Sequence, residues 1–357
     1  MSDHQGPPLL LCLNAGSTTL KAAAFAASGA DRPPVFRTTV PLGVGVDAVF
    51  RRMADEPVAV VHRVVHSGAN LRGPVDVTAE VLGELREASS LAPLHQPKAL
   101  ELLAAASRRF SSARQVACFD TDFFADLPER ATRLPVAEEL RDQGVRRYGF
   151  HGLAHASVLH ARPELREGRA VLCHLGGGCS LAALSNGEPV ATSTGMTPTG
   201  GVVMAGRCGD LDPGAVLWLL ADGRRSPQEL CDLLNTRSGL RGLSGGSGDV
   251  SGLLQDPGPR SRLAVQIYCD AIAEEAAGLA VRLGGLKRLN FSGGVGENQP
   301  PVRDAVVGRL RAAGLLRDAE VTVTRCDEER QIARLFADRD DARPTPPDAD
   351  RPAVESG

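Results

Sequence analysis

Short apolar runs separated by polar turns open the chain and predict β-strands. Leu9 to Leu13 and Leu20 to Ala26 are two such runs, and the hydroxyl-rich segment between them predicts a hairpin. Apolar runs at 58–65 and 115–120 predict two more strands, the second of which ends in Asp120. Because α/β proteins bind ligands at the carboxyl ends of strands, we expect Asp120 to lie near a ligand.

The same order of strand, glycine-rich turn and strand returns in the second half of the chain. Apolar runs at 170–175, 180–184 and 189–192 are separated by three glycines and by Asn186-Gly187, a dipeptide suited to a type I′ hairpin turn. The repeated order predicts two related domains, although no internal repeat is visible residue by residue.

Helical periodicity is prominent in the rest of the chain. The longest helical stretch, 260–283, ends before two glycines and has an apolar face made of Leu263, Ile267, Ile272, Ala276 and Leu279. A strand is expected over 286–292. We expect loops over 146–155 and over 293–298, the latter followed by a helix that starts near Pro300.

These elements predict an α/β protein with two domains and a cleft between them. A chain of 357 residues exceeds the roughly 150 residues of one domain. We expect the first domain to comprise residues 1–121 with a helix near 330–340, and the second to comprise 122–329. Residues 341–357 are rich in Asp, Pro and Arg and are expected to form a disordered tail.

Charge and hydropathy exclude several classes of partner. Forty Lys and Arg against 43 Asp and Glu give a net charge of −3, so we expect no binding to nucleic acid or to an anionic membrane. The apolar runs are far shorter than the roughly 20 residues of a membrane span, and the N-terminus does not resemble a signal peptide. The expected localisation is therefore cytoplasmic.

Arg63 and the segment 14–21 are candidates for binding an anion. Arg63 lies in an otherwise apolar strand, where an unpaired charge is costly to bury, so it needs an acidic partner or an anionic ligand such as a carboxylate or phosphoryl group. The segment 14–21, NAGSTTLK, combines hydroxyls, backbone amides and Lys21. It either holds a phosphate or is a polar hairpin turn.

Histidines beside glycines or prolines form a second set of candidates. His95 lies between two prolines and either stabilises developing charge or only anchors its loop, while Asp120 either binds Mg²⁺ or caps the next segment. His151 and His174 lie next to glycines, where the backbone can approach a ligand closely. Arg207 stands between glycines, and the segment 293–298 offers amides to a nucleotide without forming a Walker loop.

The order of these segments resembles that of the acetate kinase family, within the superfamily of actin, hexokinase and heat-shock chaperone ATPases. The resemblance runs from Asn14 to about Ala333 and rests on the strings LNAGSTTLK, HRVVHSG, LAPLHQP, FDTDFF, RRYGFHG, HLGGG, TSTGMTP, GRCGDLDP, SGLRGLSG, SGGVGEN and DEERQIA. It implies two actin-like (ribonuclease H-like) domains, a homodimer, and Mg²⁺-dependent transfer of a phosphoryl group from ATP to acetate, giving acetyl phosphate and ADP.

The resemblance also implies roles for individual residues. Arg63 and Arg207 would clamp the carboxylate and the phosphoryl group beside His151, and Asp120 and Glu328 would organise Mg²⁺. The residues implied in phosphate or nucleotide binding are Asn14, Ser17, Thr19, Lys21, His95, His174, Gly176, Gly178, Asp249, Gly294, Gly296 and Asn298. The residues implied in a pocket for the substrate methyl group are Val65, Leu94, Phe150 and Pro198.

Some positions depart from the family pattern. Val250 and Ser251 follow Asp249 where an Arg usually stands in the last place, and Phe124 replaces a usual His. Three readings therefore stay open: an acetate kinase, a related kinase for propionate or for another donor such as pyrophosphate, and a nucleotide-binding protein without catalysis.

Overall fold

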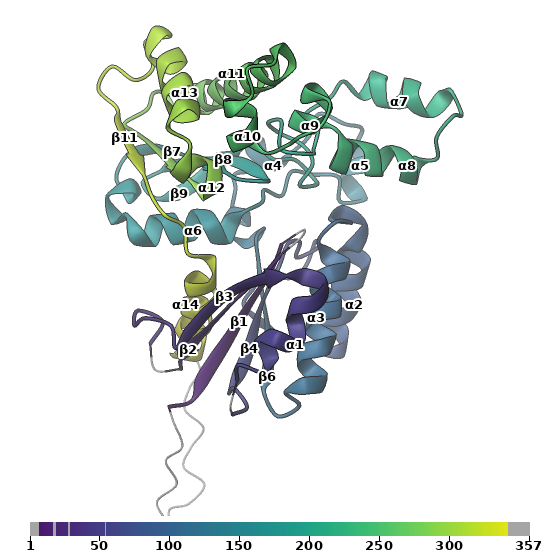
Figure 1. The fold of residues 1–357 in the computed structure, drawn as a ribbon, viewed down its shortest axis with the longest axis vertical. Helices are drawn as coiled ribbons and strands as arrows, with labels where there is room; N and C mark the ends of the chain where they lie inside the picture. Colours follow the sequence, from purple (N-terminus) through teal and green to yellow (C-terminus); the bar gives the residue numbers. More distant parts are fainter. Residues whose placement is uncertain (1–6, 17–18, 28, 54, 342–357) are drawn as a thin grey trace, which may run out of the picture.

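Two β-sheets, each covered by helices, make up the molecule (Figure 1). The computed structural model describes residues 7–16, 19–27, 29–53 and 55–341. The predicted α/β class with two actin-like halves is confirmed. The predicted tail at 341–357 lies, apart from its first residue, outside the described residues.

The first sheet has the strand order β3-β2-β1-β4-β6-β5. Strands β1 to β3 form an antiparallel meander, β4 and β6 lie parallel to β1 and to each other, and β5 is a short antiparallel edge. The predicted N-terminal hairpin is therefore present. The strands are β1 (Leu9–Ala15), β2 (Thr19–Ala26), β3 (Phe36–Pro41), β4 (Ala59–Val64), β5 (Val75–Asp76) and β6 (Arg114–Phe119).

The second sheet, with the order β11-β10-β7-β8-β9, repeats this plan. Strands β7 to β9 form an antiparallel meander, and β10 and β11 continue it in parallel. Asn186 and Gly187 both have positive φ, at 50° and 86°, as a type I′ turn requires. The strands are β7 (Arg169–Leu175), β8 (Cys179–Ser185), β9 (Glu188–Thr192), β10 (Arg288–Ser292) and β11 (Glu320–Val323).

Helices cover both sheets. Those before β7 are α1 (Leu42–Phe50), α2 (Ala79–Glu87), α3 (Gln96–Arg109), α4 (Glu129–Thr132), α5 (Glu138–Asp142) and α6 (Gly152–Ala161), with 3₁₀ turns η1 (Ala88–Leu91), η2 (Asp122–Phe124) and η3 (Pro163–Arg166). Those after β9 are α7 (Pro213–Ala221), α8 (Pro227–Asp232), the π-helical turn η4 (Leu233–Arg237), α9 (Gly239–Ser244), α10 (Val250–Gln255), α11 (Pro259–Leu283), α12 (Gly293–Asn298), α13 (Pro300–Ala312) and α14 (Glu328–Asp341). Within the described residues, none of these helices has the length and apolarity needed to cross a membrane.

Two segments predicted as loops are helical. Helix α6 begins at Gly152, inside the predicted loop 146–155. The Gly152 amide donates to the Asp120 carbonyl oxygen at 2.9 Å, and a Cβ at this position would overlap that oxygen. The glycine-rich segment 293–298 forms α12, whose first amide donates to the Glu297 side chain. In α11, Leu263 is 52% exposed and does not belong to the buried face, contrary to the prediction.

Helix α14 comes from the end of the described chain and packs on the first sheet (Figure 1). Ile332, Ala333 and Phe336 join a buried cluster with Leu10 and Phe25 of the N-terminal hairpin. The predicted helix near 330–340 therefore contacts the first half of the molecule, as expected, whereas the exact division into domains stays a prediction.

Replacing Ile332 by alanine should destabilise the protein by about 2–5 kcal/mol, because its side chain is fully buried between α14 and the sheet. Urea unfolding followed by far-ultraviolet circular dichroism measures the loss. The control is Leu217→Ala on α7, where the side chain is 67% exposed and the change should stay within about 0.5 kcal/mol. Equal effects of the two substitutions would contradict the packing described for α14.

Candidate active site

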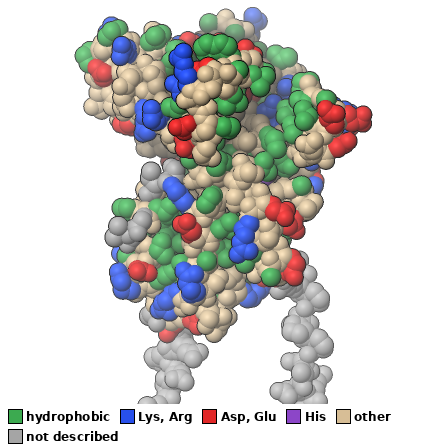
Figure 2. Space-filling view, turned by 90° about the vertical axis from the view of Figure 1, so that its right-hand side faces the viewer, with side chains coloured by type: hydrophobic (Ala, Val, Ile, Leu, Met, Phe, Trp, Pro, Cys, Tyr) green, Lys and Arg blue, Asp and Glu red, His purple; other side chains and the backbone are tan. Residues whose placement is uncertain are grey.

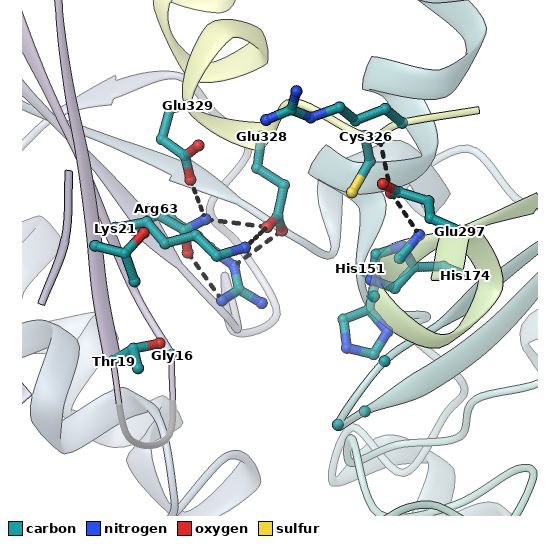
Figure 3. A pocket seen from close by; sticks show the side chains of 18 of the residues that line it. Gly16, Thr19, Lys21, Arg63, His151, His174, Glu297, Cys326, Glu328 and Glu329 are labelled. Carbon is teal, nitrogen blue, oxygen red and sulfur yellow. Dashed lines mark hydrogen bonds and ion pairs between the residues drawn. The ribbon is translucent and has the colours of Figure 1, made fainter. Parts of the chain in front are cut away.

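A cavity of about 460 Å³ lies between the two halves of the molecule (Figure 3). Its walls come from β1 to β4 and α14 on one side, and from β7, the glycine turn after it, α12 and the start of α6 on the other. Predicted site residues on its surface are Asn14, Thr19, Lys21, Arg63, His95, His151, His174, Gly176, Gly178, Arg207, Gly294 and Glu328. The structure thus brings predicted residues from both halves of the molecule to one cavity.

Arg63 lies at the centre of the first wall. Its guanidinium donates to Asp120 Oδ2 at 2.5 and 3.0 Å and to Asn14 Oδ1 at 3.1 Å. Its Nε lies 3.8 Å from Glu328 Oε1. Burial alone would lower the pKa of Arg63, but Asp120 and Glu328 raise it above its usual value. The sequence left open whether Arg63 has an acidic partner or an anionic ligand. The acidic partner is present, and Arg63 also lines the cavity.

Two adjacent carboxylates, Glu328 and Glu329, meet at Asn14. The Asn14 amide donates to Glu328 Oε2 at 3.0 Å and to Glu329 Oε1 at 2.8 Å. Burial raises the pKa of both, but Arg63 and Lys21 outweigh it at Glu328, whose pKa lies below its ordinary value. The pKa of Glu329 is raised by burial and by the charge of Glu328. Of the two carboxyl groups, Glu328 therefore has the lower pKa.

Asp120 has the features of a partial cation ligand. Its side chain is fully buried, and its Oδ1 atom has no hydrogen-bond partner in the described chain, while Oδ2 is held by Arg63. Burial raises the pKa of Asp120 against the lowering effect of Arg63. No group of three or more His, Cys, Asp or Glu side chains suited to a metal occurs among the described residues. Mg²⁺ commonly takes one or two carboxylates and completes its shell with water and phosphate, so the donor set fits such an ion.

Arg207 has no carboxylate partner within ion-pair distance among the described residues. It is only 8% exposed, donates to the Pro198 carbonyl at 3.1 Å, and its Nη2 lies 3.0 Å from His95 Nε2. Burial, together with the charge of Arg63, lowers the pKa of Arg207 to about 10, so the guanidinium is still charged at neutral pH. A buried, uncompensated cation beside a cavity indicates an anionic ligand.

The partner of Arg207 fixes the tautomer of His95. Because a guanidinium can only donate, His95 Nε2 must accept and the ring proton must lie on Nδ1. Nδ1 is buried and has no partner in the described chain. Burial, with Arg207 and Arg63, lowers the pKa of His95 to about 2, so the ring is neutral. Its one N–H, on the buried Nδ1, has no acceptor in the described chain.

His151 and His174 form the opposite wall, with ring centroids 5.1 Å apart (Figure 3). His151 adopts a left-handed backbone conformation, φ 59°, at the start of α6. A Cβ on Gly178 would lie 2.9 Å from His151 Nε2 and 3.2 Å from Arg207 Nη1, so the glycine leaves both groups open to one point. Burial and neighbouring positive groups lower the pKa of His151 well below its usual value.

The two glycine turns bring backbone close to the histidines. The Gly176 amide donates to the Gly178 carbonyl at 2.9 Å. Gly293 has φ 79°, and a Cβ there would lie 2.6 Å from the Leu175 carbonyl oxygen. Of the predicted nucleotide residues, Gly294 faces the cavity, Gly296 packs behind it, and the exposed Asn298 donates to the Gly294 carbonyl at 2.8 Å. The segment 293–298 therefore exposes its backbone only on the side that faces the cavity.

Three of the four residues predicted for a methyl pocket are buried. Val65 and Phe150 pack together with Ala92, and Pro198 supplies the carbonyl that accepts from Arg207. Leu94 is half-buried. None of the four lines the cavity defined above.

Like the four methyl-pocket residues, Asp120, Gly296, Asn298 and Asp249 do not line the cavity. Asp249 is exposed and caps α10 by accepting from the Gly252 amide at 2.9 Å. Ser17 lies outside the described residues. Conversely, sequence reasoning missed cavity residues on β3 and around α14, namely Arg37, Thr38, Thr39, Glu297, Arg325, Cys326 and Glu329. For Glu329 the signal was its place next to Glu328.

Comparison with known proteins decides the family. The model of the acetokinase family matches residues 46–337. The chain is 43% identical to the acetate kinase of Rhodopseudomonas palustris strain TIE-1 over 267 residues, which cover 73% of this chain and 67% of that protein. It is 37% identical to the acetate kinase of Micrococcus luteus over 340 residues, or 87% of each chain.

The chain belongs to the acetokinase family. Solved structures agree: a propionate kinase of Francisella tularensis superposes with a TM-score of 0.81 at 26% identity, covering 92% of this chain and 98% of that one. An acetate kinase of Porphyromonas gingivalis superposes with a TM-score of 0.77 at 28% identity, with the same coverage. The predicted family, and with it a phosphotransferase function, is confirmed.

A histidine, His66, is fully buried and packs against aromatic residues of the second half of the molecule. The ring contacts Tyr148 and Phe150 at centroid distances of 4.5 and 5.5 Å, and Nδ1 accepts from the Gly68 amide at 2.9 Å. Burial lowers the pKa of His66 to about 4. Since an unfolded histidine titrates near 6.5, the unfolded chain binds the extra proton between about pH 6.5 and 4, and stability falls as the pH falls through this window.

His66→Gln should therefore reduce the acid sensitivity of folding by about 1.4 kcal/mol per pH unit between pH 6.5 and 4.5. Urea unfolding at stepped pH, compared with the unsubstituted protein, measures the slope. His160→Gln is the control, because that side chain is exposed at the end of α6 and should change the slope far less. An unchanged slope in His66→Gln would refute the pKa assigned to this ring.

Proposed function

We propose that this protein is an acetate kinase that transfers a phosphoryl group reversibly between ATP and acetate, giving acetyl phosphate and ADP, by direct in-line displacement. One observation carries the proposal: the guanidinium groups of Arg63 and Arg207 both face one cavity, and of these two only Arg63 has carboxylate partners in the described chain. Such a pair is suited to a carboxylate and a phosphoryl group that meet between them.

The donors around Arg207 suit the charge that develops during transfer. His95 contributes an unpaired Nδ1–H, and His151 Nε2 and Arg207 Nη1 converge beside Gly178. Because these groups are held by the fold before a ligand binds, they need not reorganise during the reaction. No covalent enzyme intermediate is required, since catalysis of phosphoryl transfer rests on positioning and charge neutralisation.

Asp120 and Glu328 are the residues that would hold Mg²⁺. When bound there, the ion would neutralise charge on the phosphate oxygens. Asp120 offers its unpaired Oδ1, and Glu328 is kept ionised by Arg63 and Lys21. In the absence of the ion, Arg63 holds Asp120 in place through its other oxygen.

The nucleotide would occupy the space between the two glycine turns and the N-terminal hairpin. Thr19, Lys21 and Asn14 line one side, and Gly176, Gly178 and Gly294 line the other. Ser17, Gly296, Asn298 and Asp249 belong to the same proposal through the family resemblance. Acetate would place its methyl group against Val65, Leu94, Phe150 and Pro198, with propionate as the next candidate.

Three further features belong to the proposal. The protein acts in the cytoplasm, in keeping with a surface on which acidic and basic side chains are interspersed (Figure 2). It works as a homodimer, as the family resemblance implies. Its two domains, residues 1–121 with 330–340 and residues 122–329, close on the substrates to exclude water.

Purified protein with Mg²⁺, acetate and ATP should form acetyl phosphate, trapped as the hydroxamate. Pyrophosphate in place of ATP tests the other donor, which the departures at Val250 and Ser251 keep open, and propionate tests the acid. Activity only with pyrophosphate would replace ATP in the proposal. No activity with either donor would favour a protein that binds nucleotide without catalysis.

Arg207→Ala should lower turnover at least about 100-fold, since losing one donor to the developing charge costs about 3 kcal/mol. The substitution leaves no described carboxylate without its ion-pair partner, so the fold should persist. Arg63→Ala should lower turnover at least as much, but it also leaves buried Asp120 unpaired, and its folding must be verified by circular dichroism. Arg72→Ala, at an exposed ion pair with Asp126, is the control. Near-normal turnover in folded Arg207→Ala would remove the clamp from the proposal.

A further inference from the structure

A second histidine lies behind the cavity and is joined to His151 through one hydroxyl. His155, one turn further along α6, is fully buried and does not line the cavity. Ser180 Oγ on β8 lies 3.0 Å from His151 Nδ1 and 2.9 Å from His155 Nε2. The three side chains form a chain of hydrogen bonds that begins in the interior and ends at the cavity.

Aromatic rings surround His155 and leave its other nitrogen unpaired. Phe123 stacks on the ring at a centroid distance of 5.9 Å and an angle of 24°, and Phe124 meets it edge-on at 5.8 Å. His155 Nδ1 is buried and has no hydrogen-bond partner in the described chain. Burial, with a contribution from His174, lowers the pKa of His155 well below its usual value, so the ring is neutral and carries one proton.

The unpaired nitrogen decides the direction of the hydrogen bonds. The Ser180 hydroxyl has one proton and can donate to only one of the two rings. If it donated to His155, the His155 proton would lie on Nδ1, as a buried N–H without an acceptor, which is costly. If His155 Nε2–H donates to Ser180, the nitrogen left unpaired is only an acceptor. Ser180 Oγ makes no other hydrogen bond in the described chain, so its own proton goes to His151 Nδ1, and the His151 proton then lies on Nε2.

We propose that Ser180 and His155 are positioning residues that hold His151 in the tautomer with its proton on Nε2, so that the ring donates to an anion in the cavity. This inference rests on the proposed function of the site. It assigns roles to two residues that contact neither the cavity nor the reacting groups.

The position of His151 Nε2 determines how the tautomer affects a bound anion. Nε2 converges with Arg207 Nη1 on the space beside Gly178. With a proton on Nε2, the histidine donates to that space beside the positive charge of Arg207, whose Nη1 donates to the Pro198 carbonyl and to Met204 Sδ. In the opposite tautomer a nitrogen lone pair would face the negative oxygens of a phosphoryl or carboxylate group and repel them. The hydrogen-bond chain therefore favours anion binding without adding a charge.

The tautomer can be read directly, without substrate, in protein labelled with ¹⁵N-histidine. Two-bond nitrogen–proton correlation spectra distinguish Nδ1–H from Nε2–H rings, and a His151→Gln sample assigns the His151 signals. We expect Nε2–H for His151 in the unsubstituted protein, and a loss of that single tautomer in Ser180→Ala and His155→Leu. Nδ1–H for His151 in the unsubstituted protein would overturn the proposal.

Kinetics test the consequence in the same variants. Ser180→Ala and His155→Leu should lower kcat at least about 10-fold with a smaller change in KM for acetate, because the hydrogen-bond donor His151 contributes mainly in the transition state. Ser180→Thr keeps the hydroxyl and His155→Gln keeps an N–H at the position of Nε2, so both should restore the tautomer and most of kcat. His160→Leu, at the exposed end of the same helix, is the matched control.

The controls separate a positioning role from a purely structural one. If His155→Leu does not fold, the pair Ser180→Ala and Ser180→Thr, which changes much less volume, carries the test. Equal kcat in folded Ser180→Ala and Ser180→Thr would overturn the proposal. Absence of kinase activity in the unsubstituted protein would refute the proposed function, whereas the tautomer of His151 is measured independently of turnover.

Discussion

A buried guanidinium at the carboxyl edge of the first sheet is the interaction on which the site depends. Arg63 arrives on the central strand β4, binds Asp120 after β6 and Asn14 on β1, and lies 3.8 Å from Glu328 at the start of α14. Breaking such a buried pair by removing one partner costs about 3–5 kcal/mol. Three strands and a helix that comes from the end of the described chain must therefore be in place together. The same contacts that stabilise the fold leave one face of Arg63 and one oxygen of Asp120 without a protein partner.

The sequence is informative in its apolar runs and at positions where a charged residue interrupts such a run. The strands of both meanders follow from apolar runs and turn residues, and the repeated order of strand, turn and strand corresponds to two sheets of the same topology. Arg63 stood out because a charge interrupts an apolar strand, and it proves to be buried and paired on one side. Arg207 stood out because it lies between glycines, and in the structure its side chain is buried. For Arg63 the signal was the unfavourable burial of a charge, and for Arg207 it was the position between glycines.

Other features depend on contacts between distant segments and could not be read locally. Helix α12 has a glycine-rich sequence of low helix propensity, yet Glu297 and Asn298 satisfy the backbone groups at its start. Asp249 matched a family position, but its side chain caps α10 in the structure. The surroundings of His155 arise because Phe124 of η2 packs against the ring and Ser180 of β8, distant in sequence, shares a hydrogen bond with it. Tautomers in particular follow from which nitrogen lacks a partner, and no pattern of residues in the sequence records that.

Neutral histidines let the cavity accumulate donors without accumulating charge. Burial lowers the pKa of His95, His151 and His174, and the nearby arginines lower it further. If these rings were cationic they would repel Arg63 and Arg207 and would require more buried carboxylates to balance them. As neutral rings they donate through N–H groups whose direction is set by their other nitrogen, which Arg207 fixes for His95. Among the described residues, Arg207 is then a buried cavity cation without a carboxylate partner, and the anion that binds there supplies its counter-charge.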